Sequence, residues 1–230
     1  MMIRTAIFGF IIGLFCSCTA PRPKIVQVNF IRLLEDTTNN RRAKLDLEQL
    51  KHYNNICKAI GINRLYDGAD SIEVRAWRQF SVFGEAADEE IYSLKLFDTT
   101  VSLTFFRVYC ANVNYENGNY RDWDAFTDPK IDSFVAVSRT FPIKILEGIN
   151  LQRLWELKTQ SALHIPDNIG FTDGTTTSIE MASKSKYKLI KYHMAQAYYD
   201  ETRIRDIKTY IDEYDKLIVL FQTHLILRSH

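Results

Sequence analysis

The densest group of side chains that could carry out chemistry is a set of four aspartates, Asp122, Asp124, Asp128 and Asp132. Two carboxylates act as acid and base on a glycosidic bond when the fold holds them about 5–10 Å apart. Carboxylates also bind Ca²⁺, but an EF-hand counted from Asp122 lacks both the glycine at loop position six and the glutamate at position twelve. A polar sheet edge that resists aggregation is the alternative, and we favour it. Asp122 and Asp124 remain the candidate pair for a hydrolase.

Other catalytic patterns are missing from the sequence. Zinc proteases need two histidines four residues apart on a helix, and the five histidines include no such pair. Ser183 and Lys186 match a Ser-x-x-Lys pattern, but they lie in a predicted hairpin, where no helical turn brings them together. The glycines are scattered, so no phosphate-binding loop is expected. The sequence thus predicts no catalytic motif, no metal ligands and no cofactor.

A second candidate surface combines aromatic residues with arginines on predicted strands. Trp77, Trp123 and Arg139 stand out, together with further arginines at 75, 78 and 107. Trp, Tyr and Arg are favoured where proteins bind partners. A sheet in which arginine stems cover aromatic rings has the same composition, and we favour this explanation.

Residues 1–17 are expected to form a signal peptide. Arg4 precedes an uncharged stretch from Thr5 to Cys18, and the small residue Ser17 comes directly before Cys18. A secretory signal peptide typically has a charged start, a short apolar run and a small residue at its cleavage site. Spanning a bilayer takes about 20 mainly apolar residues, and this run is shorter.

The end of the leader, Leu14-Phe15-Cys16-Ser17-Cys18, resembles the lipobox of bacterial lipoproteins. It departs from the usual pattern because Phe15 stands where Leu, Val or Ile is normal. The resemblance implies cleavage after Ser17, lipid on Cys18 and a location in the bacterial cell envelope, anchored in the membrane. An ordinary signal peptide cleaved nearby, or an uncleaved anchor, is the alternative.

Residues 18–24 form a proline-bearing tether, and residues 25–230 are expected to form one globular domain. The first acidic residue after Cys18 is Glu35, which favours a protein that faces the periplasm. Arg4 is the only charged residue of the leader, so the 29 basic and 28 acidic residues of the chain become equal in number after cleavage. A neutral domain has no general attraction for nucleic acid.

Cys57 and Cys110 are the cysteines outside the leader and lipid site. Two cysteines in an oxidising compartment can form a disulfide. Cys57, however, lies on an apolar helix stripe, where an isolated cysteine behaves as a small apolar residue. We expect two thiols, with a Cys57–Cys110 bridge as the alternative.

The hydrophobic pattern predicts an α+β fold. Apolar residues at steps of three and four predict helices over 41–60 and 200–227, the second capped by Asp200, and a short helix over 151–163 capped by Asn150. The stripe of the first helix is Leu47, Leu50, Tyr53, Cys57 and Ile60. Alternating segments predict a mainly antiparallel sheet of about six to eight strands, over 25–34, 72–80, 92–96, 101–113, 119–126, 134–141, 175–181 and 187–192. Asn117-Gly118 and the polar residues 183–186 predict hairpin turns.

The chain beyond Trp77 contains a run of strands, then Leu154-Trp155-Glu156-Leu157, then Asp173-Gly174-Thr175. In this order they resemble a set of uncharacterised secreted bacterial proteins and lipoproteins. The resemblance implies an α+β fold and no particular function. We therefore expect a lipid-anchored envelope protein that acts as a non-catalytic binding or accessory module toward an envelope protein or cell-wall component. The alternative is an envelope-polymer hydrolase that uses Asp122 and Asp124.

Overall fold

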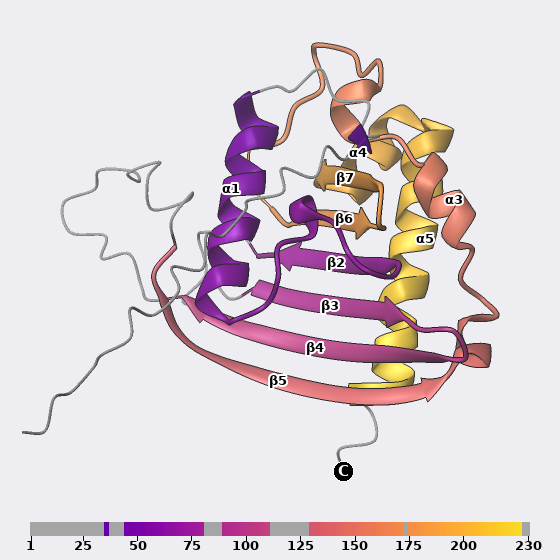
Figure 1. Cartoon of the computed structure of the whole chain (residues 1–230). Helices are drawn as coiled ribbons and strands as arrows, with labels where there is room; N and C mark the ends of the chain where they lie inside the picture. The colour runs from indigo at the N-terminus through magenta and orange to yellow at the C-terminus, as the bar shows by residue number, and fades with distance from the viewer. Residues whose placement is uncertain (1–34, 37–43, 81–88, 111–128, 173, 227–230) are drawn as a thin grey trace, which may run out of the picture. The chain divides into compact units, whose positions relative to one another are not determined.

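A computed structural model describes residues 35–36, 44–80, 89–110, 129–172 and 174–226 (Figure 1). These residues all belong to one compact unit, residues 32–230. Their strands form a seven-stranded sheet in the order β1-β7-β6-β2-β3-β4-β5. The strands are β1 (Glu35–Asp36), β2 (Glu73–Gln79), β3 (Glu89–Leu96), β4 (Thr100–Cys110), β5 (Ile131–Pro142), β6 (Thr176–Ala182) and β7 (Lys186–His193).

The sheet is mainly antiparallel, as the alternating sequence pattern predicts. Every neighbouring pair from β7 to β5 is antiparallel, and the two-residue β1 alone pairs parallel, with β7. The predicted hairpin at residues 183–186 is confirmed, because β6 and β7 pair directly around it. The α+β fold class is therefore correct. The strands predicted over 25–34 and 119–126, and the Asn117-Gly118 turn, lie outside the described residues.

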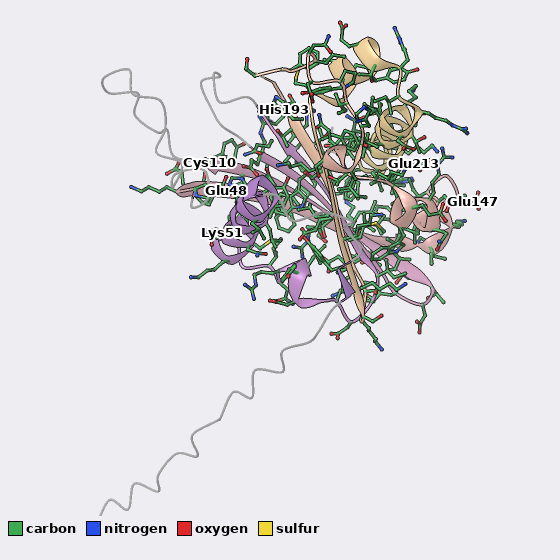
Figure 2. All side chains as sticks on the ribbon, turned by 90° about the horizontal axis from the view of Figure 1, so that it is seen from above. Glu48, Lys51, Cys110, Glu147, His193 and Glu213 are labelled. Atoms are coloured by element: carbon green, nitrogen blue, oxygen red, sulfur yellow. The ribbon has the colours of Figure 1, made fainter. Side chains whose placement is uncertain are left out.

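Helices cover both faces of the sheet. Helix α1 (Lys44–Ala59) packs on one face and contributes Tyr53, Ile56 and Cys57 to the core there. Helix α5 (Arg205–Phe221) packs on the other face, with α3 (Leu151–Glu156) and α4 (Ala195–Thr202) beside it. Figure 2 shows α1, with Glu48 and Lys51, on one side of the sheet and Glu213 of α5 on the other. Among the described residues, no helix is both long and apolar enough to cross a membrane.

The buried stripe of α1 differs from the predicted one at its start. Tyr53, Cys57 and Ile60 are buried as expected, but Leu47 is exposed and Leu50 only half-buried. Gln49 and His52 take the buried positions instead. They share the helix face with Tyr53 and Ile56, because residues three and four apart lie on one side of a helix. The stripe begins with polar side chains because the sheet beneath it carries polar partners there.

Short 3₁₀ segments join several elements, at Leu65–Asp67, Ile143–Leu146 and Gln160–Ala162. The predicted cap of α3 is confirmed, since the Asn150 side chain accepts a hydrogen bond from the Arg153 N–H at 3.0 Å. The helix ends at Glu156 rather than 163. Residues 160–162 add one separate 3₁₀ turn.

The predicted continuous helix over 200–227 is wrong. Arg203 has a left-handed backbone (φ 54°) and ends α4, where its N–H donates to the Tyr199 carbonyl at 2.8 Å. Helix α5 then starts at Arg205, and a π-helical turn (Gln222–Ile226) follows it. Asp200 therefore lies inside α4 instead of capping α5. The apolar heptad pattern begins at Ile204, after the break, so it predicts α5 but gives no information about residues 200–203.

The left-handed Arg203 gives a direct test of this break. We expect Arg203→Gly to leave the free energy of unfolding unchanged or to raise it by up to about 1 kcal/mol, because glycine adopts positive φ without strain. Arg203→Val should lower it by about 1 kcal/mol or more. Urea denaturation of the wild type and both variants measures these free energies of unfolding. A continuous helix would give the reverse, since glycine inside a helix costs about 1 kcal/mol.

Candidate functional site

A buried cluster of charged side chains lies between α1 and the sheet, centred on Arg75 of β2. The Arg75 side chain is 3% exposed. Its Nε and Nη2 donate to Glu73 Oε1 at 3.0 and 2.6 Å, and its Nη1 donates to Cys57 Sγ at 3.2 Å. Ser93 Oγ of β3 donates to the same Glu73 oxygen at 3.2 Å. The guanidinium therefore joins β2 to α1, and Glu73 extends the link to β3.

Glu180 of β6 is the second buried carboxylate of the cluster. It accepts hydrogen bonds from Trp77 Nε1 at 3.1 Å and from the Tyr187 hydroxyl at 3.0 Å. Burial raises the pKa of Glu180, while the Arg75 charge and the two donors act in the opposite direction. Burial prevails, so the carboxyl resists ionisation in the folded protein.

A second polar group lies where β2 ends and β3 begins. His52 of α1 pairs with Glu89 of β3 through Nε2 and Oε1, and both side chains are buried. Gln49 Nε2 donates to Gln79 Oε1 at 3.3 Å, and Gln79 Nε2 lies 3.5 Å from His52 Nε2. Among the described residues, the other carboxylate oxygen of Glu89, Oε2, is buried and has no hydrogen-bond partner. We call these four residues the His52 group.

The chemistry open to these buried residues is limited by their burial. A histidine held by a carboxylate has the form of an acid–base group. His52 lies on the sheet-facing side of α1 and Glu89 on the strand beneath it, so a substrate would have to displace the helix to reach them. Burial also raises the pKa of Cys57 to about 12, so this thiol stays protonated near neutral pH and is not an active nucleophile. Within the described ranges, no group of three or more His, Cys, Asp or Glu side chains is arranged to hold a metal ion.

The residues singled out from the sequence have different outcomes. Trp77 is fully buried and stacks on Tyr53 with ring centroids 4.0 Å apart, so it belongs to the core and the prediction of a binding role for it is wrong. Arg139 is exposed on β5. Asp122, Trp123, Asp124 and the lipidation residue Cys18 lie outside the described residues.

Cys57 and Cys110 are not joined by a disulfide in the structure. Cys57 is buried on the sheet-facing side of α1, and Cys110 is half-buried at the end of β4. Figure 2 shows Cys110 on the same side of the sheet as α1.

Strand β5, at one edge of the described sheet, is exposed, in contrast to the buried cluster. Residues 132–140 are all exposed, on both faces of the strand. Their apolar side chains include Phe134 (43% exposed), Val135 (51%) and Val137 (38%). In Figure 1, β5 runs along one edge of the sheet with β4 beside it. The helices cover the middle of the sheet and leave this edge exposed.

Sequence reasoning missed the buried ion pairs. Glu73, Arg75 and Trp77 alternate on one strand, which indicates a shared face, but their partners Glu180 and Cys57 come from distant segments. The alternation of side chains along a strand does not distinguish a solvent-exposed sheet face from a face that a helix covers with polar side chains.

Comparison with protein-family models and with curated proteins finds no match to this chain. The candidate sites therefore stand on their geometry alone.

Arg75 supplies the first test of the buried cluster. We expect Arg75→Met to lower the free energy of unfolding by about 3–5 kcal/mol, because Glu73 then remains buried without its cation. Arg64→Ala is the matched control: Arg64 pairs with Asp67 at the surface, and its loss should cost about 0–1 kcal/mol. Equal effects in chemical denaturation would contradict a structural role for Arg75.

The pKa of Glu180 predicts how stability depends on pH. A carboxyl whose folded-state pKa is raised stabilises the fold fully below its unfolded pKa, and this contribution is lost as pH rises through the folded pKa. In Glu180→Gln, the amide oxygen can still accept from Trp77 and the amide N–H can donate to Tyr187. The variant should therefore gain stability relative to the wild type as pH rises above the ordinary pKa of a glutamate in an unfolded chain, about 4.3. Denaturation across a pH series would contradict this prediction if the difference were constant or reversed.

Proposed function

We propose that the protein is a lipid-anchored protein of the bacterial cell envelope whose globular part is a non-catalytic binding or accessory module. The anchor rests on the leader, with Arg4, a short uncharged run and Ser17-Cys18. Two or more acyl chains hold a protein stably on a membrane, whereas one does so only marginally. A proline-bearing tether then links the anchor to the domain, which faces the periplasm.

The observation that best supports a binding role is the contrast between β5 and the interior. Arg75, Glu73 and Glu180 are engaged with one another and with core side chains, and the His52 group is covered by α1. The apolar side chains of β5, by contrast, are exposed to solvent. An exposed edge strand is a surface to which an extended segment of another protein can add main-chain hydrogen bonds.

The anchor is tested by metabolic labelling with a fatty acid in a bacterial host. The wild-type chain should take up the label and partition with membranes, and Cys18→Ser should take up none, because the thiol is the acceptor. Equal labelling of the two chains, or wild-type protein that does not partition with membranes, would contradict the lipoprotein assignment.

The binding surface is tested by comparing two lysine variants of the full-length chain. Val137→Lys places a charge on the exposed edge strand, and Val219→Lys places the same charge at an exposed position on α5, where the side chain is 56% exposed against 38% for Val137. Recovery of a saturable envelope partner should fall with Val137→Lys and stay unchanged with Val219→Lys. Equal recovery with both variants would place the binding surface elsewhere.

A further inference from the structure

The middle of strand β5, residues 133–138, lacks the devices that normally keep an edge strand from pairing with another chain. The backbone of β5 pairs with β4 on one side, from Thr100↔Pro142 to Val108↔Phe134, and no other described strand pairs with its second side. Natural edge strands are blunted by lysine, proline, short length or bulges. Residues 133–138 contain no charged residue and no proline; the irregularity in register lies next to them at Asp132, between Tyr109↔Ser133 and Cys110↔Ile131, and Arg139 and Pro142 lie toward the other end. By comparison, the opposite edge strand β1 has two residues.

We infer that β5 pairs in antiparallel fashion with β5 of a second copy of this chain, with Ala136 on the twofold axis. The inference rests on the proposed role of β5 as the binding surface and names its partner. In an antiparallel pair, residues directly opposite each other project from the same face of the sheet. A twofold pairing of one strand with itself therefore allows only registers in which opposite residue numbers are both odd or both even.

The register with Ala136 on the axis fits the side chains of β5 best. It places Val135 opposite Val137 twice, on one face of the sheet. Cross-strand apolar pairs of this kind stabilise a sheet. The smallest side chain of the exposed run lies at the crowded centre. The strand is therefore complementary to itself in its apolar residues.

The charges of β5 agree with the same register. Arg139 falls opposite Ser133, so this arginine does not face a like charge. Moving the axis to Val137 places Arg139 opposite Val135, and moving it to Val135 places Val137 opposite Ser133. Each shift keeps one valine pair, the axial valine opposite its own copy, instead of two. A second copy thus matches β5 in shape and charge at one register.

Disulfide trapping in the full-length protein tests this pairing. In Ala136→Cys, two cysteines would lie directly opposite each other with Cβ atoms about 4.5–5.5 Å apart, within reach of a bond after a small adjustment. The matched control is Thr140→Cys, because two such residues would lie roughly 26 Å apart, eight residues along the strand. We expect a covalent dimer of Ala136→Cys on non-reducing gels after mild oxidation, with only the wild-type background for Thr140→Cys.

Adding Val137→Lys to Ala136→Cys should lower the dimer yield roughly tenfold, because the two lysines approach diagonally across the pair and the valine contacts are lost. Adding Val219→Lys should leave the yield unchanged. Equal trapping at positions 136 and 140, or no trapping at 136, would overturn the self-pairing. If trapping fails while Val137→Lys still abolishes recovery of an envelope partner, the proposed binding role stands and its partner is a different chain.

Discussion

The fold depends on how one buried cation is compensated. Arg75 lies in the middle of the sheet beneath α1, and removing a charge from water is costly unless partners replace its hydration. Glu73 accepts two of its N–H groups and the Cys57 sulfur a third. Because Cys57 belongs to α1, this compensation also fixes the helix to the strands. Glu180, close enough for its pKa to respond to the Arg75 charge, extends the cluster to β6.

This interior has a consequence for the outer surface. Covering the cluster requires α1 on one face of β2, and the apolar core on the other face requires α5. Two helices crossing a seven-stranded sheet cover its centre, and β5, the last strand of the order, stays exposed along most of its length. The same arrangement that encloses the ionisable groups thus leaves a long edge strand for contact with other chains. The enclosed ionisable groups and the exposed edge strand together favour binding at the edge over catalysis in the interior.

The sequence pattern predicts the sheet and the helices well where one face is apolar and the other polar. The β6–β7 hairpin, α3 with its Asn150 cap and the second half of α1 follow from periodicity and turn residues. The sequence pattern fails where polar side chains are buried. His52 and Gln49 are buried beside Glu89 and Gln79. The apolar pattern predicts Leu47 and Leu50 at the buried positions of α1 instead. Arg75 and Trp77 lie in the interior because distant residues, Glu180 and Tyr53, are their partners. The break at Arg203 depends on one backbone angle, which periodicity does not encode.

Native-state hydrogen exchange along α1 tests the central claim most directly, because it measures whether the helix opens separately from the sheet. The account predicts that the amides of Tyr53 to Ile60 exchange with the same opening free energy as those of β2 and β6, since the Arg75 cluster joins all three. Exchange of α1 at a clearly lower free energy, with β2 and β6 still protected, would contradict it. The His52 group would then be accessible in an opened state, and the interior would again be a candidate for catalysis.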